Sequence, residues 1–74
     1  MKCTVKLIWD LETNKWHTET DDVLCLALES YSFDVLVERV RMAAPEMIEL
    51  NSGYKGPVQL HFEIERTDIL KMVS

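Results

Sequence analysis

The 74-residue sequence is poor in glycine, proline and cysteine, with two of each. Because 47% of its residues are hydrophobic, so little glycine and proline argues against a disordered or loop-rich chain. Two cysteines, Cys3 and Cys25, are too few for the disulfide framework of a small secreted domain. The sequence predicts a single domain over residues 1–74, in which residues 67–74 form either a tail or a short helical turn.

Long apolar runs are also missing. The first ten residues, MKCTVKLIWD, alternate apolar side chains with lysines and so lack the unbroken apolar stretch of a signal peptide. No stretch is long enough to cross a bilayer. We therefore expect a cytoplasmic protein with no membrane contact.

Basic residues are scarce, eight against thirteen acidic ones, for a formal net charge of −5. A negative field repels phosphate backbones, so we expect no direct binding of nucleic acid. The same field favours a basic partner.

Alternation of apolar and polar residues predicts strands at residues 2–9, 15–20 and 58–65. The first two are joined by a short turn and form an antiparallel hairpin. Trp9 and Trp16 flank that turn on the apolar face, where we expect them to pack together.

A third strand is predicted at residues 23–28, where almost every residue is apolar. Such a strand is either internal or has its outer face against another chain. Val23, Cys25 and Ala27 fall on the face away from the other apolar residues of this strand. They are therefore candidate partner-binding residues.

The segment that follows predicts a long helix, with Ser32 as its N-cap and the sequence Asn51-Ser52-Gly53 at its end. Its apolar residues close on one stripe, and Pro45 falls on the solvent side, where it should bend the helix. Val35 and Met42 also lie outside the stripe, two turns apart. They are either ordinary exposed apolar residues or a docking ridge for a partner.

These elements predict an α+β fold of order β-β-β-α-β, a mixed four-stranded sheet with one long helix on one face. The long connection lets the fourth strand return parallel, giving the spatial order 3-2-1-4. The outer face then places Lys2 and Lys6 between Glu19 on one side and Glu63 and Glu65 on the other, as cross-strand ion pairs.

Residues for catalysis or metal binding are not apparent. Cys3, His17, Cys25 and His61 do not have the close spacing of metal ligands. A set of Cys25, His17 and Asp22 has no oxyanion hole or nucleophile elbow beside it. Asp10 and Asp22 lie at predicted turns, and Glu63 and Glu65 have lysine neighbours. These structural roles account for the carboxylates better than the metal site of a two-metal nuclease would. We expect no enzyme, no cofactor and no metal.

Several stretches resemble one small bacterial family. They are W-D-x-E-x-x-x-W at 9–16, D-D-V at 21–23, L-A-L-E at 26–29, S-F-D-V-L-V-E-R-V-R at 32–41 and A-A-P-E-M-I-E-L-N at 43–51. The chain is identified as a member of the short stand-alone branch of the HicB-like antitoxin superfamily, catalogued as a domain of unknown function. The family usually has Pro-Gly after the acidic corner, which is formed here by Asp21-Asp22. This sequence has Leu24-Cys25 instead.

The resemblance implies a sheet related to a truncated ribonuclease-H-like fold and a module that binds a small basic toxin, HicA. It carries over no catalytic residues, and the DNA-binding domain of longer relatives has no counterpart in these residues. Two interpretations stay open. One is a non-catalytic, antitoxin-like protein-binding module. The other is a homo-oligomeric structural domain without a toxin partner, whose copies meet at the third strand or through the C-terminal tail.

Overall fold

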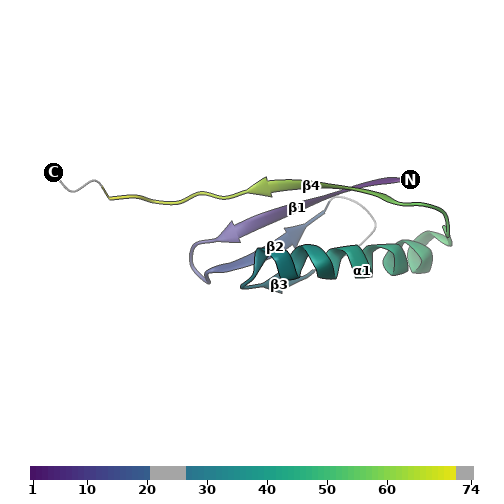
Figure 1. The fold of residues 1–74 in the computed structure, drawn as a ribbon, viewed down its shortest axis with the longest axis horizontal. Coiled ribbons are helices and arrows are strands. Elements are labelled where there is room, and N and C mark those ends of the chain that lie inside the picture. Colours follow the sequence, from purple (N-terminus) through teal and green to yellow (C-terminus); the bar gives the residue numbers. More distant parts are fainter. Residues whose placement is uncertain (21–26, 72–74) are drawn as a thin grey trace.

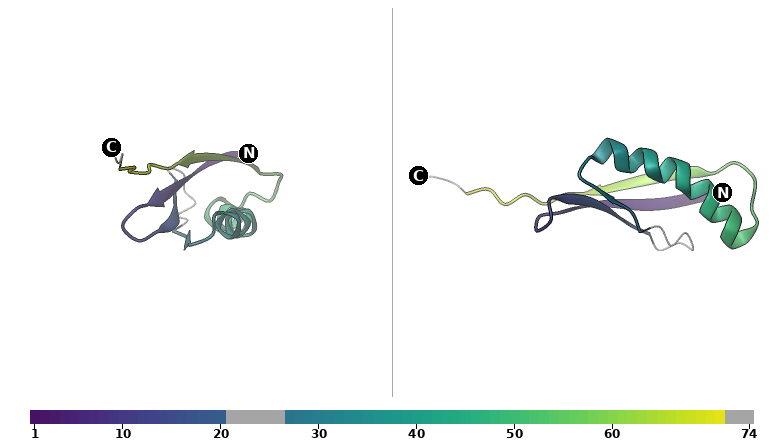
Figure 2. Two further views of the ribbon diagram at one scale, coloured as in Figure 1. Left: turned by 60° about the vertical axis from the view of Figure 1, so that its left-hand side comes forward. Right: turned by 90° about the horizontal axis from the view of Figure 1, so that it is seen from below.

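The fold, a computed structural model that describes residues 1–20 and 27–71, is one sheet with one helix on a single face (Figures 1 and 2). Its elements are β1 (Lys2–Asp10), β2 (Lys15–Glu19), β3 (Glu29–Ser30), α1 (Phe33–Ser52) and β4 (Gln59–Glu65). The sheet has the order β3-β2-β1-β4. This confirms the predicted α+β class and strand order.

β1 is the central partner in the sheet. It pairs antiparallel with β2 and parallel with β4, with Lys6 opposite Glu19 on one side and Glu63 on the other. The Lys6 Nζ atom lies 4.0 Å from a carboxylate oxygen of Glu65. The predicted row of opposite charges across the outer face is therefore present at Lys6.

The core lies between the sheet and α1. Four helix residues spaced four apart, Leu36, Val40, Ala44 and Ile48, are fully buried. They belong to one cluster with the β1 and β2 residues Cys3, Val5, Leu7 and Trp16. The buried residues of β1 are spaced two apart and those of α1 four apart, and the two sets pack against each other in one apolar interface.

Both ends of α1 are capped as the sequence predicts. The Ser32 hydroxyl accepts a hydrogen bond from the backbone N–H of Val35 at 3.3 Å. Gly53 ends the helix in the left-handed region at φ 73°, and its N–H donates to the Glu49 carbonyl at 2.8 Å. Pro45 is exposed, as predicted, and the helix continues through it without a break.

Aromatic rings pack at the hairpin end of the sheet. The ring centroids of Trp9 and Trp16 lie 5.3 Å apart, which confirms their predicted contact, and Phe33 of α1 lies 5.0 Å from Trp16. The guanidinium of Arg66 stands 4.5 Å from the Trp9 ring centroid. Arg66 thereby fixes the point where the chain leaves β4.

The third strand differs from the prediction. β3 comprises Glu29–Ser30, later than the expected residues 23–28, of which 23–26 lie outside the described residues. Its extent is set by its antiparallel partner, since Trp16 is opposite Ser30 and His17 is opposite Glu29. Just before β3, the Leu28 carbonyl accepts from the Thr18 N–H at 3.0 Å. Backbone pairing with β2 therefore makes a strand of two polar residues, Glu29 and Ser30, just after the predicted strand.

The chain beyond β4 runs away from the body of the molecule (Figures 1 and 2). Residues 66–71 form no helix or strand and are exposed. They account for the elongated outline of 58 × 18 × 17 Å. Within this segment, the described residues 67–71 form no helical turn.

Candidate protein-binding surface

One flank of α1 carries exposed apolar side chains beside the buried stripe. Val35 is 44% exposed, Met42 71% and Leu50 80%. A spacing of seven residues places Val35 and Met42 nearly above one another along the helix, and Leu50, eight residues on, stands about 80° farther round it. The flank is thus a row of side chains that the core does not use.

A hollow of about 290 Å³ lies where this flank meets the segment before β3. It is lined by Leu28, Arg39, Met42, Ala43 and Glu46. Arg39 closes one side, because its Nη1 donates to the backbone carbonyl of Glu29 at 3.3 Å. The apolar lining comes from Leu28, Met42 and Ala43, and charged groups stand at the rim.

A second hollow, of about 430 Å³, lies next to the first at the edge of the sheet. Its lining residues are His17, Thr18, Ala27, Leu28 and Glu29. Leu28 lines both hollows, and its N–H donates to the Thr18 hydroxyl at 3.1 Å, which fixes its position. We call the residues that line these two hollows the Leu28 surface.

The structure brings two of the predicted partner-binding residues together. Ala27 is exposed and Met42 is exposed, and each lines a hollow that Leu28 shares. Val35 lies on the same flank but lines neither hollow. Val23 and Cys25 lie outside the described residues.

Sequence reasoning missed every residue of this surface other than Ala27 and Met42, among them Leu28, Arg39 and Glu46. The alternation pattern assigns Leu28 to the core-facing side of its strand, and it does pack partly against the core. Arg39 and Glu46 carry a usable signal, because each lies within four residues of Met42 on the same side of the helix.

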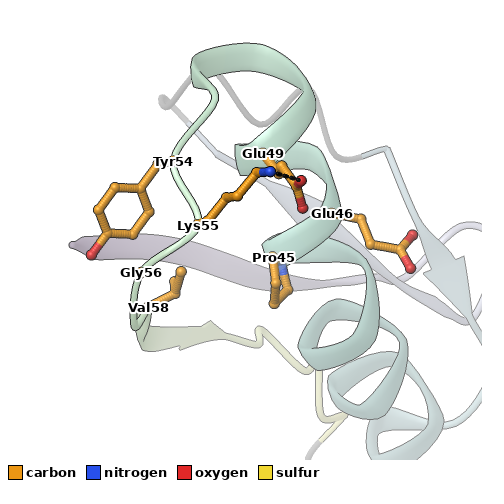
Figure 3. A pocket seen from close by; sticks show the side chains of 7 residues that line it. All are labelled: Pro45, Glu46, Glu49, Tyr54, Lys55, Gly56 and Val58. Atoms are coloured by element: carbon orange, nitrogen blue, oxygen red, sulfur yellow. Dashed lines mark ion pairs between the residues drawn. The ribbon is translucent and has the colours of Figure 1, made fainter.

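Near the C-terminal end of α1 lies a third hollow, of about 190 Å³, whose lining includes Glu46, Glu49 and Lys55 (Figure 3). Glu46 lines this hollow as well as the one beside Leu28, and Glu49 pairs with Lys55 at 3.7 Å. The last helical turn has no basic residue, so the negative end of the helix dipole is not offset there. Glu46 therefore carries the negative charge that the two hollows share, while Lys55 offsets that of Glu49.

The Leu28 surface combines apolar and charged side chains. Across residues 1–20 and 27–71, no three His, Cys, Asp or Glu side chains are grouped so as to hold a metal ion. Cys3 is buried in the core. The arrangement offers an apolar floor with carboxylates and a guanidinium around it, as protein interfaces do.

The fold and this surface define a small α+β domain with a helix-flank surface. The chain belongs to the family described as Domain of unknown function (DUF1902), which it matches over residues 2–74. The match confirms the predicted membership of a domain of unknown function.

A solved structure shares the whole fold. Hypothetical protein TTHA1013 from the extremely thermophilic bacterium Thermus thermophilus is 31% identical, with a TM-score of 0.77 over 95% of this chain and 100% of that chain. A comparison with curated proteins finds no match. Within the described residues, no helix has the length and apolar character needed to span a membrane.

Proposed function

We propose that this chain is a non-catalytic protein-binding module, antitoxin-like, whose Leu28 surface and the acidic end of α1 receive a basic protein. The observation that carries the proposal is the hollow lined by Leu28, Met42 and Ala43 with Glu46 at its rim. An apolar floor next to uncompensated negative charge suits a partner with an apolar anchor and basic side chains around it.

Met42 is the residue best placed to be the contact point. It is 71% exposed although it neighbours half-buried Ala43, so its side chain contributes little to the core. Methionine is flexible and polarisable, and it adapts to the shape of an incoming side chain. Burying it in a complex would remove apolar area from water.

Charge supports the choice of partner. The chain has a net charge of −5, and Glu46 takes part in none of the ion pairs found among residues 1–20 and 27–71. Complementary charge speeds encounter with a basic protein more than it adds affinity. A small basic toxin of the HicA type fits this description, and the proposed module binds it in the cytoplasm without contacting nucleic acid or membrane itself.

The test is capture from a lysate of the native host with the purified chain as bait, at low and at high salt. We expect a small basic protein to be recovered at low salt and in a smaller amount at high salt, because salt screens the charges that speed its encounter with the bait. Recovery of no protein other than the bait chain itself would refute the proposal.

A further inference from the structure

Among the residues that the structure describes, β4 has one edge without a neighbouring strand, and the chain that follows it is exposed. β4 ends the sheet order and pairs with β1 alone among the described strands. Ile64 is 61% exposed although its neighbour in the sheet, Leu7, is fully buried. Farther along, Ile69 is 80% and Leu70 85% exposed. An unpaired edge with apolar residues on it invites another strand.

The sequence of this segment is complementary to itself. Residues 63–71 read Glu-Ile-Glu-Arg-Thr-Asp-Ile-Leu-Lys. When the segment is laid antiparallel on a copy of itself with Thr67 opposite Thr67, Glu63 meets Lys71 and Ile64 meets Leu70. In the same register, Arg66 meets Asp68, and the remaining pair places Glu65, which lies 4.0 Å from Lys6 of its own chain, opposite Ile69. Opposite-charge, apolar and Thr–Thr pairs are those that stabilise antiparallel strands.

We propose that two copies of this chain pair antiparallel through residues 63–71, with a twofold axis at Thr67, so that the tail of each continues the sheet of the other. This interface is separate from the Leu28 surface and does not rest on the basic partner. The two sheets then join into one, in the order β3-β2-β1-β4 followed by the same strands reversed. A symmetric contact of this kind is isologous, with the same residues on both sides.

The faces of the sheet agree with this register. Side chains alternate along an extended strand, so Ile64, Arg66, Asp68 and Leu70 share one side. Leu60, Phe62 and Ile64 are opposite the buried or helix-facing β1 residues, which makes that side the helix-covered face. Leu70 of the second copy would therefore cover Ile64 on the apolar side, while Lys71 and Glu63 meet on the other.

An ion pair already present shows that the central residues can pair. Within one chain, the Arg66 Nε lies 3.1 Å from a carboxylate oxygen of Asp68 while the guanidinium rests on Trp9. In the proposed pair, each Arg66 keeps its place on Trp9 and exchanges its own Asp68 for that of the second copy. An unrelated basic partner would not account for complementarity about one residue.

A cysteine placed on the axis tests the register. In a Cys25→Ser background, Thr67→Cys puts two thiols opposite each other, within the Cα separation of about 4.4–6.8 Å that a disulfide needs. The matched control is Ile69→Cys, whose two copies lie four residues out of register. On mild oxidation, non-reducing electrophoresis should show a covalent dimer for Thr67→Cys at least tenfold faster than for Ile69→Cys. Equal rates, or no dimer from Thr67→Cys, would overturn the proposal.

Charge exchange gives an independent test by sedimentation equilibrium of the full chain. Lys71→Glu places two carboxylates opposite each other and should raise the dimer dissociation constant roughly tenfold. The double variant Glu63→Lys, Lys71→Glu should return it to within about threefold of the original. A wild-type chain that stays monomeric at high micromolar concentration, or a double variant as weak as the single one, would contradict the pairing.

Discussion

Leu36 and Met42 lie on different sides of the same helix. Truncating Leu36 to alanine should lower the stability of the protein strongly, and truncating Met42 should hardly change it. Leu36 is fully buried, whereas Met42 is 71% exposed. Leu36→Ala removes buried methyl groups and leaves a cavity, which costs about 3 kcal/mol of unfolding free energy. Met42→Ala should stay within about 0.5 kcal/mol, because it exchanges one good helix former for another on the surface.

The size of the domain makes this difference easy to measure. At about 0.05–0.15 kcal/mol per residue, 74 residues have a total stability of roughly 4–11 kcal/mol. Losing about 3 kcal/mol therefore removes a large share of it and lowers the melting temperature by about 12–24 °C.

The appropriate assay is unfolding in urea, monitored by tryptophan fluorescence, because Trp16 is only 6% exposed and changes environment on unfolding. Both variants should be measured at two protein concentrations, so that association does not enter the comparison. A Met42→Ala loss above about 1.5 kcal/mol would mean that Met42 holds the core. A Leu36→Ala loss below about 1 kcal/mol would refute the burial argument.

Three further predictions follow from the ends of α1 and from the buried thiol. Ser32→Ala should lower stability by about 1 kcal/mol through loss of the bond to the Val35 N–H, and Ser32→Asp should retain most of it, both by urea titration. Gly53→Ala should cost about 1–2 kcal/mol in the same assay, because a side chain is strained at φ 73° although nothing crowds it there; no loss would contradict the cap. In a Cys25→Ser chain, Cys3 should react with a thiol reagent only after unfolding, and rapid native labelling would contradict its burial.

Most of the fold could be predicted from the sequence because its signals are local. Alternation defines β1, β2 and β4, and the residues at the two helix caps mark the ends of α1. The lysine at position 6, with acidic residues on both neighbouring strands, indicates that β1 lies inside the sheet. The strands and the helix caps depend on residues close together in the chain. The position of β1 depends on the pattern of charges that its neighbouring strands share with it.

β3 could not be placed in the same way. Two polar residues carry no strand pattern of their own, and they become a strand only because β2 offers backbone partners at Trp16 and His17. The Leu28 surface could not be predicted from the sequence for a related reason. Its hollows arise from the distance between a sheet edge and a helix flank, which no local pattern of residues records.

The role of the self-complementary segment 63–71 could not be predicted from the sequence for a different reason. Its apolar residues Ile69 and Leu70 fit a helical turn, a tail or an interface equally well by pattern. Only the position of β4 at the edge of the sheet gives the following residues a strand to continue. The meaning of this segment therefore depends on topology.

The central claim is that the Leu28 surface binds a basic protein, and a matched pair of baits tests it most directly. Met42→Lys adds a positive charge on that surface, and Leu11→Lys adds the same charge in the β1–β2 turn, at a residue 42% exposed. The measurement is the amount of the captured basic protein on each bait, relative to wild type, by quantitative mass spectrometry. We predict capture by Leu11→Lys close to that of wild type and at least a tenfold loss for Met42→Lys. Equal capture by the two variants would contradict the account.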